Sequence, residues 1–320
     1  MIRTARPGDG AALHALWALC FPTARHLPAL HALDPGRHHR TFVAARTDGT
    51  LDAVVVYVPR TLRDATGAPR RVGGIGSVAT RPEARGRGLV GELLARAVDT
   101  MTAEGCAWSL LFTGTPGVYR GSGWREFHRP RTEGALPARN GRTSEGSGRY
   151  RVRPVLPADA PAVVRLQSAH NAARPLSTVR DADDWRVRVP AWYGPHCWSL
   201  LAEPRRGGPP RGWLVARPTG PDRVDVLETA HEPAAPGVLD DLYAHLAARA
   251  RARTAGRTGV RLLTPPCAAS RRAAPLLIAA GTAVEAVDPT GMARPLTEAP
   301  DRVERTLAAP GAVHWYGDSF

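Results

Sequence analysis

The sequence lacks lysine, has few cysteines and contains no long apolar run. All 43 basic residues are arginines spread along the 320-residue chain, so the formal net charge of +14 is not gathered into a basic stripe. A nucleic-acid interface would concentrate this charge and interleave aromatic side chains. We therefore expect no nucleic-acid partner, and the positive field favours anionic small molecules instead.

Two other absences narrow the class of protein. The four cysteines lie far apart and form no CxxC pair, which argues against a metal site and against a disulfide framework. No segment approaches the roughly 20 apolar residues of a membrane helix, and the N-terminus has no apolar region of a secretory signal. We expect a cytoplasmic protein with no membrane partner. A length of 320 residues fits two domains of about 150 each.

The first 130 residues mix helical and strand-like patterns. Apolar residues recur at a spacing of 3.6 from Leu89 until Gly105 ends the helix, and an Asp-Gly turn separates two strand-like runs, of which the second is rich in valine. The pattern predicts a mixed sheet of the α/β or α+β class. The expected elements are a helix after Asp9, strands at 41–46, 52–62 and 71–80, a helix from Leu89 and a strand at 106–112.

A Gly/Ser-rich polar stretch at residues 131–149 predicts a linker, after which a similar order of elements returns. We therefore expect two copies of one fold: a first domain at 1–135, a linker at 136–149, a second domain at 150–298 and a tail at 299–320. The elements expected in the second half are strands at 150–155, 198–203, 212–217, 223–230 and 260–265, helices at 159–171, 237–253 and 270–280, and an extended segment at 283–294.

The loop Arg85–Val90, RGRGLV, joins a strand to the amphipathic helix. Unpaired backbone amides and the helix dipole make such a helix start attractive to anions. Gly86 and Gly88 let a phosphate approach the backbone, while Arg85 and Arg87 add charged donors. The loop has no Gly-Lys-Ser/Thr and no GxGxxG followed by a ribose-binding acid. The sequence thus predicts a diphosphate-binding loop of another kind.

This loop resembles the signature of the GNAT acetyltransferase superfamily, Arg/Gln-x-x-Gly-x-Gly/Ala, which follows a V-x-V-x-P strand end. The corresponding residues here are Val78-Ala79-Thr80-Arg81-Pro82 and Arg85-Gly86-Arg87-Gly88-Leu89-Val90. Val90 replaces the final small residue, a departure that is similar to the R-R-R-G-L-L loop of the enhanced intracellular survival acetyltransferases. Downstream, GTPGVYRGSGW resembles the family's Y-x-x-x-G-F motif, with Tyr119 as the tyrosine.

The resemblance implies two tandem GNAT-like domains, each a mixed sheet, and a V-shaped split that holds acetyl-CoA in the first. Backbone groups of Val78 and Thr80 would bind the pantetheine arm, and residues Arg85, Gly86, Arg87, Gly88, Leu89 and Val90 would bind the pyrophosphate. Tyr119 would act as the general acid. The second copy is degenerate, since its corresponding stretch reads HEPAAPGVLDDLY, and we expect no CoA there.

The general base is left open. In the survival-protein group the C-terminal carboxylate returns to the active site, so Phe320 is the leading candidate, followed by Asp318 and His314. We expect substrate contacts from Asp318 and from a flap before the first long strand, which contains His26, Asp34, His38 and His39. The flap residues can equally be solvated surface groups. The C-terminal tail can equally be a segment that packs against its own domain without a catalytic role.

The expected function is transfer of acetyl to a primary amine of a small molecule such as an antibiotic, an amino sugar or a biosynthetic intermediate. The alternative is a non-catalytic acyl-CoA-binding or ligand-sequestering protein, and peptide N-acetylation is a third possibility. The acceptor, the acyl chain length and the oligomeric state stay open.

Overall fold

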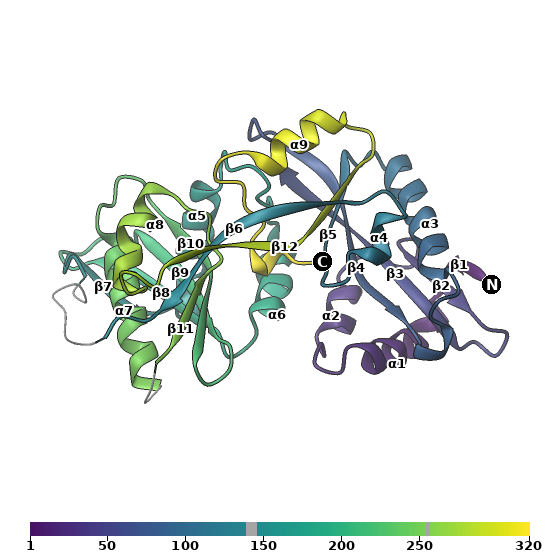
Figure 1. Ribbon diagram of the computed structural model, residues 1–320, viewed down its shortest axis with the longest axis horizontal. Helices are drawn as coiled ribbons and strands as arrows, with labels where there is room; N and C mark the ends of the chain where they lie inside the picture. The colour runs from purple at the N-terminus through teal and green to yellow at the C-terminus, as the bar shows by residue number, and fades with distance from the viewer. Residues whose placement is uncertain (139–145, 254–256) are drawn as a thin grey trace.

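The computed structural model describes residues 1–138, 146–253 and 257–320. A continuous twelve-stranded sheet runs through it in the order β1-β2-β3-β4-β5-β12-β6-β11-β10-β9-β8-β7. Two lobes lie at the ends of this sheet, and the long strands β6 and β12 cross between them (Figure 1). The strands are β1 (Ile2–Thr4), β2 (Thr41–Ala45), β3 (Leu51–Arg63), β4 (Pro69–Thr80), β5 (Trp108–Phe112), β6 (Arg125–Ala135), β7 (Tyr150–Pro154), β8 (Trp198–Pro204), β9 (Gly212–Pro218), β10 (Arg223–His231), β11 (Gly259–Leu262) and β12 (Val284–Pro295).

Helices cover both faces of the sheet in each lobe. They are α1 (Gly10–Cys20), α2 (Leu27–Ala32), α3 (Leu89–Ala103), α4 (Gly117–Arg120), α5 (Ala160–His170), α6 (Val189–Tyr193), α7 (Val238–Arg253), α8 (Ala268–Ala273) and α9 (Pro300–Ala308). Together with the mixed sheet they confirm the expected α/β fold in two lobes.

The valine-rich run in β3 is continuous because both of its faces are buried. Val55 and Tyr57 point into a core with Leu93 and Met101 of α3. Val54 lies in a second core with α1 on the other face. The amphipathic helix predicted from Leu89 is therefore the cover of one face of the first lobe.

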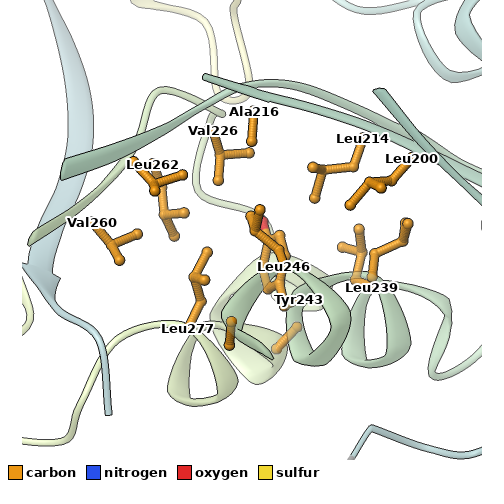
Figure 2. Close-up of a cluster of buried hydrophobic side chains, with 14 of the residues drawn as sticks. Leu200, Leu214, Ala216, Val226, Leu239, Tyr243, Leu246, Val260, Leu262 and Leu277 are labelled. Carbon is orange, nitrogen blue, oxygen red and sulfur yellow. The ribbon is translucent and has the colours of Figure 1, made fainter. Parts of the chain in front are cut away.

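The second lobe has the same layered construction. Helix α7 lies across one face of its strands and packs Tyr243 and Leu246 against Leu214 and Val226 (Figure 2). Helix α5 covers the opposite face, where Leu166 belongs to a core with residues of β8 to β10. The repeated order of elements that the sequence indicated thus corresponds to two similar layered units.

Strands β6 and β12 tie the two lobes together. Gly291–Pro295 of β12 pair with β5 in the first lobe, while Val284–Asp288 pair with the distal half of β6. The end of β6, Thr132–Ala135, in turn pairs with β11 of the second lobe. The sheet of the first lobe is therefore completed by residues from near the end of the chain.

Two expectations change at this crossing. Residues 131–135 open the polar stretch that predicted a linker, but they form the end of β6, because backbone pairing with β11 and β12 outweighs their polar composition. The segment at 283–294 is extended as expected, but its last residues pair with β5 of the first lobe. Much of the remaining expected linker, residues 139–145, lies outside the described residues. Within the described part of the chain, no helix is long and apolar enough to cross a membrane.

Candidate active site in the split between β4 and β5

Strands β4 and β5 run parallel and then separate. Their pairing extends from Val72 opposite Trp108 to Gly74 opposite Leu110. Beyond that point β4 continues to pair with β3, and β5 continues to pair with β12. The two strand ends therefore diverge, which confirms the V-shaped split.

A cavity of about 510 Å³ opens at this split. Its walls come from β4, from the end of β5, from the first-lobe helices and from α6 of the second lobe. The lining residues are Phe21, Ala24, Leu27, Ile75, Gly76, Ser77, Val78, Phe112, Thr113, Gly114, Thr115, Tyr119, Trp192, Ser319 and Phe320.

A β-bulge interrupts β4 beside the cavity. Ala79 pairs with Val54 and Gly76 with Val56, so Ser77 and Val78 both lie opposite Val55. Such a bulge removes backbone groups from the ladder and is common next to active sites. Ser77 adopts a φ of +53°, and its carbonyl accepts a hydrogen bond from Trp17 Nε1 at 3.1 Å. The bulge thereby turns the backbone at Val78 toward the cavity, whereas Thr80 stays paired with Ala53.

The loop after β4 has the conformation that an anion-binding site requires. Gly86 and Gly88 have φ values of +74° and +75°, and Gly88 is the N-cap residue of α3. A Cβ at either position would meet no atom within 4 Å, so the glycines are needed for the backbone angle. No side chain caps the helix start. The first amides of α3 are thus free for a ligand.

The remaining loop residues divide by exposure. Arg85 and Arg87 are exposed, and Arg87 lies 3.6 Å from Asp52. Leu89 and Val90 are half-buried and pack on the core under α3. The side chain of Val90 is therefore directed into the core.

Tyr119 lies on the short helix α4 and lines the cavity. Its side chain is buried, and burial raises the pKa of the phenol to about 12, against a smaller opposing contribution from Thr113. The phenol is consequently protonated at neutral pH. It has the protonation state that a general acid requires.

The C-terminal residue returns to this cavity. A Cβ added to Gly76 would lie 2.8 Å from both the carbonyl carbon and an oxygen of Phe320, and one added to Gly74 would collide with the Phe320 ring. Phe320 therefore lies directly over two glycines that share one face of β4. Glycines at alternate strand positions signal such a close approach, and Gly74 and Gly76 are that signal in the run RVGGIGSV.

Aromatic contacts hold the Phe320 ring in place. It packs on Phe112 with ring centroids 6.2 Å apart and on His314 with centroids 5.2 Å apart. His314 is fully buried, and burial lowers its pKa to about 3, so the ring is neutral. His314 does not line this cavity, and it contacts the site through the rings of Phe320 and Phe112.

Asp318 was expected to contact the substrate or to act as the base, but it is buried away from the cavity wall. Its carboxylate is fully buried and accepts a hydrogen bond from Arg180 Nε at 2.7 Å. Burial works against ionisation, but the Arg180 charge prevails and keeps the pKa of Asp318 below its usual value. Because this carboxylate is already paired inside the protein, it is not placed to contact an acceptor.

The flap residues lie outside the cavity wall. The His26 ring meets the edge of Trp192 at 4.8 Å, and Trp192 does line the cavity. Asp34 forms an ion pair with Arg40 at 2.8 Å and lines a small neighbouring cavity that Phe320 also borders. Of the predicted residues, the structure thus gathers Val78, Tyr119 and Phe320 in one cavity.

The turn before α7 in the second lobe corresponds to the loop before α3 in the first lobe, but its neighbouring residues differ. Gly237, with a φ of +79°, precedes α7 as Gly88 precedes α3. A Cβ at Gly237 would lie 2.6 Å from Ser147, whose hydroxyl donates to Asp241 at 2.7 Å. The amides of Gly148 and Tyr150 also donate to Asp241. This helix start therefore has Ser147 against its glycine and Asp241 paired with neighbouring backbone, and it has Ala234 and Pro236 where the first lobe has Arg85 and Arg87.

The split sheet and the uncapped glycine–arginine loop lie in the same strand–loop–helix unit of the first lobe. Residues 1–127 match the sequence model of the acetyltransferase (GNAT) domain family. The matched residues make up most of the first lobe, which is therefore similar to a GNAT domain.

Several solved structures have the same fold. A probable N-acyltransferase from Enterococcus faecalis has a TM-score of 0.71 at 15% identity, over 93% of this chain and 73% of that one. A GCN5-related N-acetyltransferase from Kribbella flavida has a TM-score of 0.67 at 18% identity, over 93% of this chain and 71% of that one. Eis1 from Mycobacterium abscessus has a TM-score of 0.64 at 14% identity, over 93% of this chain and 74% of that one. No curated protein matches the sequence.

Proposed function

We propose that the protein is an acetyl-CoA-dependent N-acetyltransferase that transfers acetyl directly to a primary amine of a small molecule. The observation that carries this proposal is the cavity at the split, where Tyr119 and the carboxyl end of Phe320 meet the bulged strand β4. Tyr119 is a protonated acid and Phe320 supplies a carboxylate, so the cavity contains both partners of a proton transfer.

The cofactor's placement follows from the strand–loop–helix unit. The pyrophosphate would meet the free amides of α3 together with Arg85 and Arg87. The pantetheine arm would follow β4, with backbone groups of Val78 and Thr80 as its hydrogen-bond partners. The thioester then lies in the cavity, close to Tyr119.

In the proposed reaction the substrate enters as an ammonium ion and first loses a proton to the Phe320 carboxylate. The neutral amine attacks the thioester carbonyl, and the C–S bond breaks with the electron pair on sulfur. Tyr119 gives its proton to this thiolate, and the surplus proton on the new amide nitrogen restores the phenol. The Phe320 carboxyl group then releases the first proton to solvent, which restores the base. Holding the two reactants together supplies much of the rate gain.

The second lobe contributes to the same site. Trp192 of α6 forms part of the cavity wall, and the tail is fixed by contacts with the second lobe. A cavity of about 510 Å³ with a wall from the second lobe favours a small acceptor over an extended peptide. In this proposal the first domain ends at residue 135, the second spans residues 150–298, and the tail follows. The chain binds one CoA, in the first lobe.

The test is a thiol-release assay with acetyl-CoA against amines, polyamines, aminoglycosides and peptides. The proposal predicts thiol release with at least one small amine. Tight CoA binding without thiol release for any amine would instead support a non-catalytic acyl-CoA-binding protein. Preferred turnover of peptides would show that the acceptor class is wrong.

A further inference from the structure

A second cavity of about 300 Å³ lies between the lobes, next to the proposed acetyl site. Phe112 and Ser319 line both cavities, so the two adjoin at the tail. Strands of both lobes and the tail form its walls, and four of the wall residues are arginines: Arg129 and Arg131 of β6, Arg217 of β9 and Arg261 of β11.

The charges in this wall do not cancel. Arg129 pairs with Asp288, the acidic residue of the wall, and Arg261 pairs with Asp225. Arg131 lies 2.7 Å from Glu133. For Arg217 no carboxylate partner is found among the described residues. The wall therefore has one positive charge in excess.

The free cation is also held in a defined position. The Arg217 guanidinium stacks on the ring of Tyr316, 4.3 Å from its centroid. Arg129 similarly stacks on Phe112 at 4.3 Å. Stacking fixes the planes of these guanidinium groups while leaving N–H donors at their edges, which suits recognition of an oxyanion.

We propose that this interlobe cavity binds a carboxylate or phosphate group carried by the acceptor amine. This inference rests on the proposed function and narrows it to amines that bear an oxyanion. The acidic group would lie among the arginines, and the amine would reach past Phe112 and Ser319 to the acetyl site. Polyamines and aminoglycosides would be disfavoured, because their cations would face the unpaired arginine.

Matched acceptors provide the first test. O-phosphoethanolamine is compared with ethanolamine, and β-alanine with β-alaninamide, by kcat/KM in the thiol-release assay. We expect the acidic member of at least one pair to be favoured tenfold or more, and the pair that shows it identifies phosphate or carboxylate. Equal turnover within both pairs, or preference for neutral or polycationic amines, overturns the inference.

A variant locates the effect. Arg217→Met keeps much of the side-chain volume but removes the charge, and should abolish the preference while leaving the neutral acceptor unchanged. Arg206→Met removes an equivalent charge from the exposed β8–β9 turn and should change neither. Equal losses for both acceptors in Arg217→Met would contradict the assignment.

Anion binding separates failure of this inference from failure of the proposed function. Inorganic phosphate and acetate are titrated into the full chain by calorimetry in the presence of saturating CoA, so that the anion-binding loop at the start of α3 is already occupied. Weak binding that Arg217→Met removes and Arg206→Met retains supports the cavity as an oxyanion site even if no amine is acetylated. Absence of binding, or binding unaffected by Arg217→Met, overturns it.

Discussion

Arg180 and Asp318 form a fully buried ion pair that joins the second lobe to the tail two residues before Phe320. The Nε–Oδ1 distance is 2.7 Å, and the same guanidinium donates to Glu228 at 2.9 Å. Neither side chain of the Arg180–Asp318 pair is exposed to solvent. A buried ion pair can be a weak source of net stability, yet removing one partner leaves an uncompensated charge. The pair therefore serves to fix the terminus over β4.

Replacing Arg180 by methionine should release the tail. We expect a loss of about 3–5 kcal/mol in unfolding free energy. In protein that stays folded, kcat should fall at least tenfold while the affinity for acetyl-CoA is retained, since the α3 loop is untouched. Calorimetry, denaturant unfolding and steady-state kinetics measure the three quantities.

The control for Arg180 is an exposed ion pair. Asp301 and Arg305 lie 2.6 Å apart on α9, with most of both side chains in solvent. Asp301→Asn should change neither stability nor kcat, because exposed pairs contribute little. A drop in acetyl-CoA affinity equal to the drop in kcat for Arg180→Met would indicate general damage and not loss of positioning.

Gly76→Ala tests the approach of the terminus to β4. The added Cβ would lie 2.8 Å from the Phe320 carbonyl carbon, so the carboxylate must move. We expect kcat to fall tenfold or more, because catalysis is sensitive to displacements of this size. Gly10→Ala is the matched control, since its Cβ would meet nothing within 4 Å, and unchanged activity is expected there. Full activity in Gly76→Ala would remove Phe320 from the mechanism.

Gly88→Ala tests the phosphate loop. Alanine at a φ of +75° costs about 1–2 kcal/mol and distorts the start of α3, so KM for acetyl-CoA should rise with little change in kcat. Gly49 has a φ of +85° in the β2–β3 turn and is equally uncrowded. Gly49→Ala should show the same loss of stability with an unchanged KM, and equal KM values for the two variants would exclude the loop as the cofactor site.

Tyr119→Phe should lower kcat by about 10²–10⁴, the range for loss of general acid–base catalysis, while CoA binding persists. Because burial places the pKa of Tyr119 at about 12, the acid form is lost only as pH rises through that value. The pH–rate profile should therefore show no falling limb between pH 6 and 10. A falling limb near pH 8 that disappears in Tyr119→Phe would contradict this assignment.

Local patterns in the sequence were sufficient for most of the fold. The 3.6-residue spacing from Leu89 predicted α3, and the Asp-Gly turn predicted the β2–β3 hairpin, because both depend on neighbouring residues. The same holds for the loop Arg85–Val90, where strand, glycines and helix are contiguous. These features need no information from distant parts of the chain.

The missed features all depend on partners far away in sequence. Pairing of Gly291–Pro295 with β5 joins segments some 180 residues apart, and nothing in their local pattern specifies it. The burial of Asp318 requires Arg180 and Glu228 from the second lobe. Among the site residues, only the paired glycines Gly74 and Gly76 offered a local sign that something lies against β4.

The most direct measurement of the central claim moves the terminal carboxylate and leaves everything else in place. The intact chain and a variant extended by one glycine after Phe320 are compared for CoA affinity by calorimetry and for thiol release with the best acceptor. The account predicts equal affinity in both proteins and a loss of turnover of at least tenfold in the extended one. Equal turnover, or no thiol release from the intact chain with any amine, would contradict it.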